Sequence, residues 1–391
     1  MQKSGDTLFS TQFVLLALSS VLFMGSFNMI IPELPSYLTS LGGKEYKGLI
    51  ISLFTLTAGL SRPFSGKLAD TIGRMPVMVI GVIVCIVIGV LYPLLNSITG
   101  FFILRLIHGF STGFKPTGTS AFLADIVPIN KRGEALGYIG VAGSIGMAGG
   151  PVLGSYIAQE FGIDNMFYSS SIVALLSIII LGGMKETLPN KEKFKLKHLI
   201  ISPKDVIDLS VIAPSLVMTL TAFSFGIILT VVPDFSDHLE ISNRGTFFSF
   251  MLIASIFVRF FAGKASDKYG RVGLIKIGSI LLSAGMMIVA FATSTIMFLS
   301  GAVVIGISVG INSPTIFAWT VDLVDDKHRG RGLSTMFIAL EIAIGVGAFS
   351  SGFTYNNDPS NFPLTFGLGS ILAFSSFVYL MIYPKQHTCL G

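Results

Sequence analysis

Four ionisable residues lie inside long apolar stretches of the chain: Glu33, Arg105, Lys115 and Glu341. A charged side chain at the centre of a bilayer costs about 2.5–3.5 kcal/mol on insertion scales, so each should face a cavity or a partner. A buried carboxylate can bind and release a proton, and a buried cation can hold an anionic group. These residue types therefore favour the binding of protons and small molecules.

Glu341 has no basic neighbour within its own helix turn, so burial favours its protonated form, and we predict that it carries protons. Structural hydrogen bonding is the alternative. Glu33 and Arg105 each lie roughly 10 Å inside the same boundary at about 1.5 Å per residue. We expect them to pair, either as a proton- or substrate-responsive switch or as a permanent salt bridge.

A polar stripe follows one expected helix at i, i+3, i+7 and i+10: Arg105, His108, Thr112 and Lys115. This spacing places the four on one broad face, which should line a cavity. A packed, hydrogen-bonded His108 and a Lys115 that extends to the headgroups are the alternatives. The predicted proton-coupling residues are Glu341, Glu33, Arg105 and His108. The predicted substrate-binding residues are Asn28, Glu33, Arg105, His108, Thr112, Lys115, Asn312 and Glu341.

The elements that position these residues are membrane helices. The 391 residues are 52% hydrophobic and only 12% charged, and the mean hydropathy is +0.78, so the bilayer must solvate most of the chain. We predict an all-α integral membrane protein with twelve transmembrane helices in two six-helix repeated halves. The expected helices are 11–40, 46–69, 76–95, 98–124, 133–160, 165–184, 208–239, 244–265, 272–292, 295–322, 331–354 and 361–383.

The basic residues gather in alternate connections, after the second, fourth, sixth, eighth and tenth expected helices. By the positive-inside rule, both termini and the linker at 185–207 are then cytoplasmic. The linker separates an N-terminal bundle (1–184) from a C-terminal bundle (208–391). The net charge of +5 reflects this topology and not nucleic-acid binding. The lysine-rich linker is expected to be a solvated topology anchor, with contact to anionic lipid as the alternative.

The chain also aligns with itself at an offset of 197 residues, the separation of Arg62 and Arg259. The same offset pairs Asp70 with Asp267 and Arg74 with Arg271. It further pairs Gly109 with Gly306, Gly113 with Gly310, Asp125 with Asp322, and Arg132 with Arg329. Two duplicated bundles place a substrate site between the halves, near the midplane.

The stretch 66–74 (GKLADTIGR) and its copy 263–271 (GKASDKYGR) resemble the signature of the major facilitator superfamily, and within it the drug–proton antiporter branch. In that family the signature latches the cytoplasmic side of the outward-open state. The resemblance assigns this role to Asp70, Arg74, Asp267 and Arg271, with Asp125 and Asp322 as partners. We place Arg62, Arg132, Arg259 and Arg329 in the same gating set. Static capping of the loops is the alternative.

Two further stretches carry the resemblance. Residues 105–113 (RLIHGFSTG) resemble the family's arginine motif, with His108 in place of a usual glutamine. Residues 146–155 (GMAGGPVLGS) resemble the glycine–proline motif of antiporters, with Ser155 in place of a final glycine. The expected helix-packing residues there are Gly146, Gly150, Pro151 and Gly154. The first helix ends in a similar double-proline pattern, Pro32 and Pro35, with an unusual Glu33 between the prolines.

The resemblance implies a proton-coupled exporter of small amphiphilic compounds in the cytoplasmic (inner) membrane. The alternative is a symporter or facilitator for a nutrient or an anionic metabolite, which the cations Arg105 and Lys115 keep open. We expect no enzyme, since HExxH, Walker and GxSxG motifs are absent from the sequence. We also expect no metal, no cofactor other than protons as the coupling ion, and a monomer.

Overall fold

The computed structural model describes residues 9–128, 131–201, 206–324 and 329–383; within these, the side chains of Gly133, Lys264, Arg329 and Gly330 are not described. The N-terminal helices are α1 (Thr11–Met29), α2 (Leu34–Ser40), α3 (Lys47–Thr71), α4 (Arg74–Leu91), α5 (Ile98–Ile126), α6 (Arg132–Phe161) and α7 (Ile163–Gly182). The C-terminal helices are α8 (Ile212–His238), α9 (Thr246–Tyr269), α10 (Arg271–Ala290), α11 (Thr295–Asp322), α12 (Arg329–Tyr355) and α13 (Phe362–Ile382). The predicted all-α architecture of twelve spans in two halves is confirmed.

Within the described residues, ten of the spans are long and apolar enough to cross a membrane, judged by length and composition. The other two are α3, which carries Arg62, and α5, which carries Arg105 and Lys115. The charges on these two helices face neighbouring helices, since α5 packs between α3 and α4, and α3 packs on α12.

The first expected helix, 11–40, is broken. A short 3-10 turn at Ile31–Glu33 separates α1 from α2, and Pro32 lies inside it. Because proline has no backbone N–H to donate, the α-helical hydrogen-bond ladder cannot run through this point. The break places Glu33 where the turn packs against α6 and α8.

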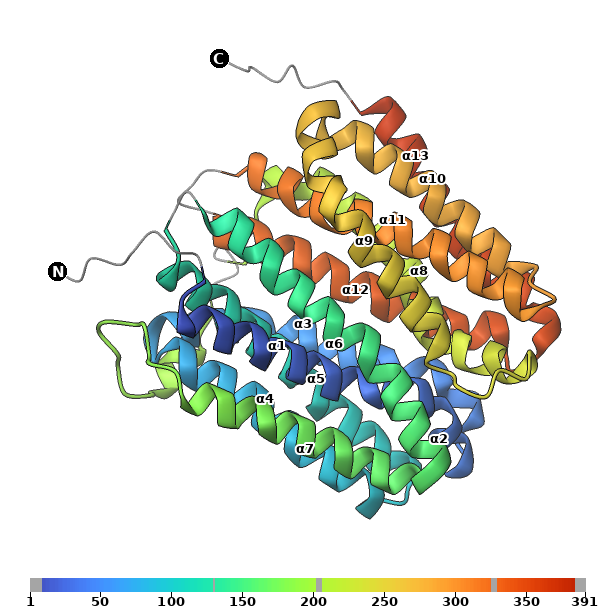
Figure 1. Ribbon diagram of the computed structural model, residues 1–391, viewed down its shortest axis with the longest axis horizontal. Helices are drawn as coiled ribbons and strands as arrows, with labels where there is room; N and C mark the ends of the chain where they lie inside the picture. Colours follow the sequence, from blue (N-terminus) through green and yellow to red (C-terminus); the bar gives the residue numbers. More distant parts are fainter. Residues whose placement is uncertain (1–8, 129–130, 202–205, 325–328, 384–391) are drawn as a thin grey trace.

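Each half is a separate bundle, drawn blue to green and yellow to red in Figure 1. In the first bundle α1 packs on α6 and α7, and α5 packs on α3 and α4. In the second, α8 packs on α12 and α13, and α11 packs on α9 and α10. The halves meet along two helix pairs, α3 with α12 and α6 with α9, which the offset of 197 residues interchanges.

The two ends of the molecule differ. The connections α3–α4, α5–α6, α7–α8, α9–α10 and α11–α12 lie at one end, here called the basic end; the others lie at the far end. At the far end the halves are in close contact. A Cβ on Gly48 of α3 would lie 2.8 Å from the Ala348 carbonyl oxygen of α12. Gly245, before α9, lies against the backbone of Pro151 in α6.

The linker between the halves is attached to α3 at the basic end. Lys67 donates to the Ile200 carbonyl oxygen at 2.5 Å, and the backbone N–H of Glu192 donates to the Thr71 carbonyl oxygen at 2.9 Å. The linker contains a short 3-10 turn, Leu196–Leu199. It is therefore folded against the N-terminal bundle in the part that the structure describes.

Candidate functional site

An ion pair joins the two halves at mid-depth. Arg62 of α3 donates from Nη2 to Oε1 of Glu341 on α12 at 2.6 Å, and only 12% and 9% of the two side chains is exposed. The guanidinium also lies 4.7 Å from the centre of the Phe337 ring, while its Nε is buried without a partner. The α3–α12 interface thus holds one buried positive and one buried negative charge.

This pair corrects the expectation that Glu341 has no basic partner. The reasoning considered only neighbours along its own helix, whereas the cation comes from the other half. Gly59 of α3 allows the approach, because a Cβ there would lie 3.3 Å from the Glu341 Cβ. The sequence did single out Arg62, but as a gating residue of the repeat.

Arg105 is fully buried inside the N-terminal bundle and does not reach Glu33. Its Nε donates to the Ile50 carbonyl oxygen at 2.8 Å, and its Nη1 donates to the Tyr92 hydroxyl at 3.3 Å. The guanidinium lies 4.6 Å from the centre of the Phe54 ring, and Nη2 has no partner. The predicted Glu33–Arg105 pair is therefore wrong, because equal depth in the membrane does not imply the same side of the bundle.

The rest of the α5 stripe is also buried among N-terminal helices. Nδ1 of His108 lies 3.3 Å from the Tyr92 hydroxyl, and its Nε2 has no partner. Thr112 donates to the carbonyl oxygen of Gly109 in its own helix. Lys115 donates to the Ser20 hydroxyl at 2.8 Å. Tyr92, which the sequence reasoning missed, connects Arg105 to His108; its position after an apolar helix gave no signal of that role.

The two asparagines have local partners. Asn28 donates to the Met24 carbonyl oxygen one turn earlier at 2.8 Å. Asn312 donates to Ser308 at 3.3 Å and contacts Gly278 of α10, while its Oδ1 is buried without a partner. Asn312 therefore lies between α11 and α10, within the C-terminal bundle.

Glu33 forms a second ion pair between the halves, at the far end. Its Oε1 accepts from the Ser155 hydroxyl of α6 at 2.6 Å, and its Oε2 accepts from Nη1 of Arg244 at 2.5 Å. Arg244 precedes α9 and also holds Asp237 through two bonds, of 2.7 and 2.9 Å. Burial alone would lower the pKa of Arg244, but its bonds to Asp237 and its attraction to Glu33 raise that pKa, so the guanidinium stays charged.

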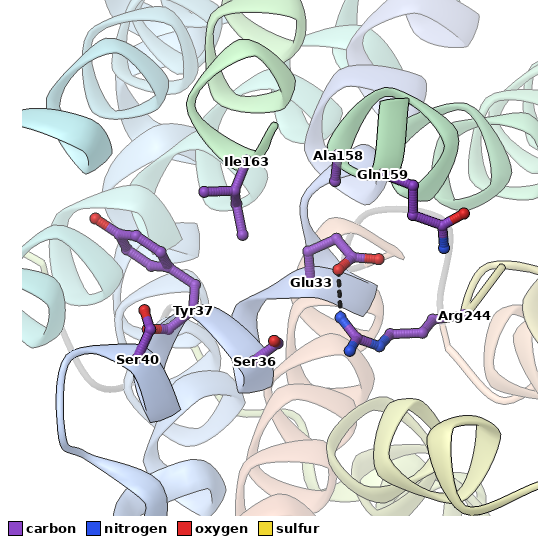
Figure 2. A pocket seen from close by; sticks show the side chains of 8 residues that line it. All are labelled: Glu33, Ser36, Tyr37, Ser40, Ala158, Gln159, Ile163 and Arg244. Carbon is purple, nitrogen blue, oxygen red and sulfur yellow. Dashed lines mark hydrogen bonds and ion pairs between the residues drawn. The ribbon is translucent and has the colours of Figure 1, made fainter. Parts of the chain in front are cut away.

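The Glu33–Arg244 pair borders a cavity of about 330 Å³. Figure 2 shows the pair at one side of the cavity, with Tyr37 of α2 and Ile163 of α7 on the other. Ser36, Ser40, Ala158 and Gln159 complete the lining. The cavity wall thus combines one ion pair, several hydroxyl and amide groups, and a small apolar surface.

A matching pair lies nearby. Lys47, the first residue of α3, donates to Asp234 of α8 at 2.5 Å. Lys47 and Arg244 are related by the offset of 197 residues. In each half, a cation at the start of the second span therefore holds a carboxylate at the end of the other half's first span. Lys47, Asp234, Arg244 and Asp237 were missed because they lie near the ends of the expected helices, where a charge gives no signal of a buried partner.

The signature residues form a cluster within each half at the basic end. Arg74 holds Asp70 at 2.6 Å and Asp125 at 3.1 Å. In the second half Arg271 holds Asp267 at 2.5 Å and Asp322 at 2.9 Å. Asp125 and Asp322 therefore contact the arginines with which they were predicted to pair. Each of the two clusters connects helices within its own bundle.

The remaining gating candidates have different surroundings. Arg132 donates twice to the Ala124 carbonyl oxygen. Arg259 lies 3.4 Å from the Ser255 hydroxyl and near Gly140 of α6. The side chain of Arg329 lies outside the described residues. Glu186, which was missed, accepts from the backbone N–H groups of Arg74, Met75, Thr187 and Leu188.

The glycines of the α6 motif face α1. A Cβ on Gly150 would lie 2.5 Å from the Gly25 carbonyl oxygen, and one on Gly146 or Gly154 would overlap the α1 backbone. Pro151 lies instead at the contact with Gly245 of the other half. The motif therefore sets the distance between α6, which carries Ser155, and α1, which the turn with Glu33 follows.

Comparisons with known proteins agree with this architecture. A family model described as Major Facilitator Superfamily matches residues 16–247 and, in a second match, 214–388. The multi-drug resistance efflux pump PmrA of Streptococcus pneumoniae is 31% identical over 332 residues, which cover 80% of this chain and 80% of the pump. Multidrug resistance protein 2 of Bacillus subtilis is 28% identical over 247 residues, 61% of each protein.

Among solved structures, the inward-open conformation of the xylose transporter XylE from E. coli is similar, with a TM-score of 0.77. The match covers 96% of this chain and 97% of that chain at 14% identity. At this identity the likeness shows the fold, and the substrate named for that protein carries no argument here.

Proposed function

Because this chain belongs to the major facilitator superfamily, we propose that it is a proton-coupled exporter of small amphiphilic compounds that works by alternating access. The observation that carries the coupling is the buried Arg62–Glu341 ion pair across the α3–α12 interface. The similarity to efflux pumps of Streptococcus pneumoniae and Bacillus subtilis supports the substrate class.

In the proposed cycle Glu341 is charged while Arg62 holds it, as in this conformation. Moving the halves apart at mid-depth would leave a buried carboxylate without its cation, and binding a proton removes that cost. Proton binding and helix separation are thus linked at one residue. An amphiphilic cation can take the place of Arg62 at the same carboxylate, which makes substrate and proton alternative partners.

The direction of opening follows from the placement of the hydrogen bonds between the halves. Among the described residues they lie at the far end and at mid-depth, for example Lys47–Asp234, Arg244–Glu33 and Arg62–Glu341. The positive-inside rule puts the basic end in the cytoplasm, with both termini. We therefore propose that this conformation is closed to the outside, with the signature latches unengaged between the halves.

The transport test uses the full chain in liposomes that contain a pH dye. A panel of amphiphilic cations and anions is added under an imposed gradient, and we expect the cations to move against protons. Glu341→Gln should abolish the proton signal, while Glu160→Gln, at an exposed position near the end of α6, should retain it. Movement of compounds with protons, or without any proton signal, would replace antiport by an uptake or facilitator role.

The orientation is tested separately with a membrane-impermeant thiol reagent on intact cells. A cysteine introduced at the exposed Lys193 of the linker should be protected, and one at the exposed Glu240 of the far end should react. The reverse pattern would invert the proposed topology, and this conformation would then be closed to the cytoplasm.

A further inference from the structure

The structure places in contact two positions at which the chain departs from its family's pattern. Glu33 stands between the two prolines that end the first span, and Ser155 replaces the final glycine of the α6 motif. The Ser155 hydroxyl donates to Glu33 at 2.6 Å, and Glu33 is 4% exposed. Glu33 is thus a buried carboxylate that has both a hydroxyl donor and a cation as partners. The Arg62–Glu341 pair at mid-depth does not involve these residues.

We propose that Glu33 is a proton-binding site of the far side, which takes up a proton when the halves separate there and its counter-ion Arg244 leaves. The inference rests on the proposed alternating access and adds a residue that responds to acid outside. Glu341 remains the residue proposed to couple protons to substrate.

The two partners of this ion pair respond differently to opening. Arg244 and Asp237 lie on the same connection between α8 and α9, so Arg244 keeps the two bonds to Asp237 when the halves part. Glu33 lies in the other half and keeps only Ser155, which is on α6 of its own half. Opening thus leaves the cation neutralised and the carboxylate without a cation. A carboxylate that loses its cation binds a proton more readily than the paired one does.

The other charged groups of this region do not supply a substitute cation within the residues that the structure describes. Lys47 is bound to Asp234, which the Tyr355 hydroxyl also contacts. Tyr37 donates to the Tyr92 carbonyl oxygen. The elements around Glu33 carry several titratable groups near the far end: Asp234, Asp237 and His238 on α8, Glu240 and Arg244 on its connection to α9, Tyr37 on α2, Asp164 at the start of α7, and Tyr156 and Glu160 on α6.

The linkage has a definite sign and size. If Glu33 binds a proton in the open form and none in the closed form, acid on the far side favours opening. One proton per molecule gives at most a tenfold rise in the open-to-closed ratio per pH unit, by proton linkage. The rise occurs only at pH values between the proton affinities of the two forms, and it needs neither substrate nor a gradient across the bilayer.

The test follows opening by thiol labelling in proteoliposomes. The labelling site is introduced by Ala348→Cys in a Cys389→Ser background. Ala348 lies on α12 and is fully buried against α3 and α8. The native Cys85 is buried, and the same background without Ala348→Cys measures its contribution. An impermeant maleimide is added at the far side over a pH series, with rates corrected for the intrinsic pH dependence of the thiol reaction. We expect the corrected rate to rise on acidification.

Three variants decide the assignment. Glu33→Gln should label at neutral pH as fast as the parent does in acid, with no further rise. Asp234→Asn, which removes the repeat-related pair, should label faster yet keep its pH dependence. Ser155→Gly should move the transition to higher pH, because the open form loses the hydroxyl that stabilises the Glu33 carboxylate. If Glu33→Gln fails to fold, Ser155→Gly still tests the assignment.

A pH dependence that persists in Glu33→Gln, or that disappears in Asp234→Asn, would overturn the proposal. So would an unchanged transition in Ser155→Gly. The outcome is separable from the transport test, because labelling uses no substrate. Acid-dependent labelling without proton antiport would retain the Glu33 site and reject the coupled exporter. Proton antiport together with labelling that does not depend on pH would support the coupled exporter and reject the Glu33 site.

Discussion

The buried ion pair at mid-depth allows a quantitative prediction about Arg62→Met. This change removes the cation but leaves an apolar side chain against Phe337, over which the guanidinium now lies. Glu341 then remains at 9% side-chain exposure without a counter-ion. Breaking a buried pair from one side costs about 3–5 kcal/mol.

We therefore expect Arg62→Met to lower the melting temperature at neutral pH by about 6–10 °C, taking about 2 °C per kcal/mol. The sign of the pH effect follows from linkage. In the variant, a charged Glu341 is buried without a cation, which destabilises the folded state, whereas a protonated Glu341 has no such cost. The loss of melting temperature relative to the parent protein should accordingly be smaller at acidic pH, because a protonated Glu341 needs no cation.

The double variant Arg62→Met, Glu341→Gln removes both charges. It should recover most of the loss and show little dependence on pH, because a neutral pair of similar size can replace a buried ion pair at small cost. The assay is thermal unfolding of the purified protein in detergent at pH 5 and pH 7. Arg132→Met, at an exposed arginine that bonds a carbonyl oxygen, serves as the control and should change stability little. A double variant no more stable than the single one would refute the reasoning, as would a deficit that acid does not change.

Two further predictions concern packing and buried hydrogen bonds. Gly150→Ala should destabilise the protein by about 1–3 kcal/mol, because the new Cβ would press on an α1 carbonyl oxygen. Gly149→Ala is the control, since a Cβ there meets open space and should not destabilise the protein. Thermal melting curves of the two variants measure the difference. Tyr92→Phe removes the hydroxyl that Arg105 and His108 share, and should cost about 1–3 kcal/mol by the same assay; an unchanged stability would mean that water replaces the hydroxyl.

The helices could be predicted from sequence because membrane spans are set by apolar length, which is a local property. The exception is the first span, where Pro32 breaks the helix and changes the direction in which Glu33 points. The proline was visible, and the double-proline pattern was noted, but the run of apolar residues continues through it. Its effect on backbone hydrogen bonding therefore outweighed the hydropathy signal.

The charge pairs could not be predicted in the same way. Depth along a helix follows from the rise per residue, but the partner depends on the rotation of each helix and on which helices are neighbours. Glu33 meets Arg244, and Glu341 meets Arg62, each across the boundary between halves. One signal was available: the offset that revealed the repeat also equates Lys47 with Arg244, and basic residues at equivalent helix starts favour equivalent roles.

The duplication preserves the charge clusters at both ends of the molecule but not the charge at mid-depth. The offset that relates Arg62 to Arg259 relates Glu341 to Ser144, whose hydroxyl bonds to Gly140 within α6. Arg259 has no carboxylate within ion-pair distance among the described side chains, although it also faces the other half. The two interfaces are therefore equivalent by the repeat in their helices, while only α3–α12 holds a carboxylate–arginine pair at mid-depth among the described side chains. If proton coupling requires a carboxylate that opening deprives of its cation, the described side chains of the α6–α9 interface include no such residue at mid-depth, and Glu341 alone would exchange one proton there per cycle.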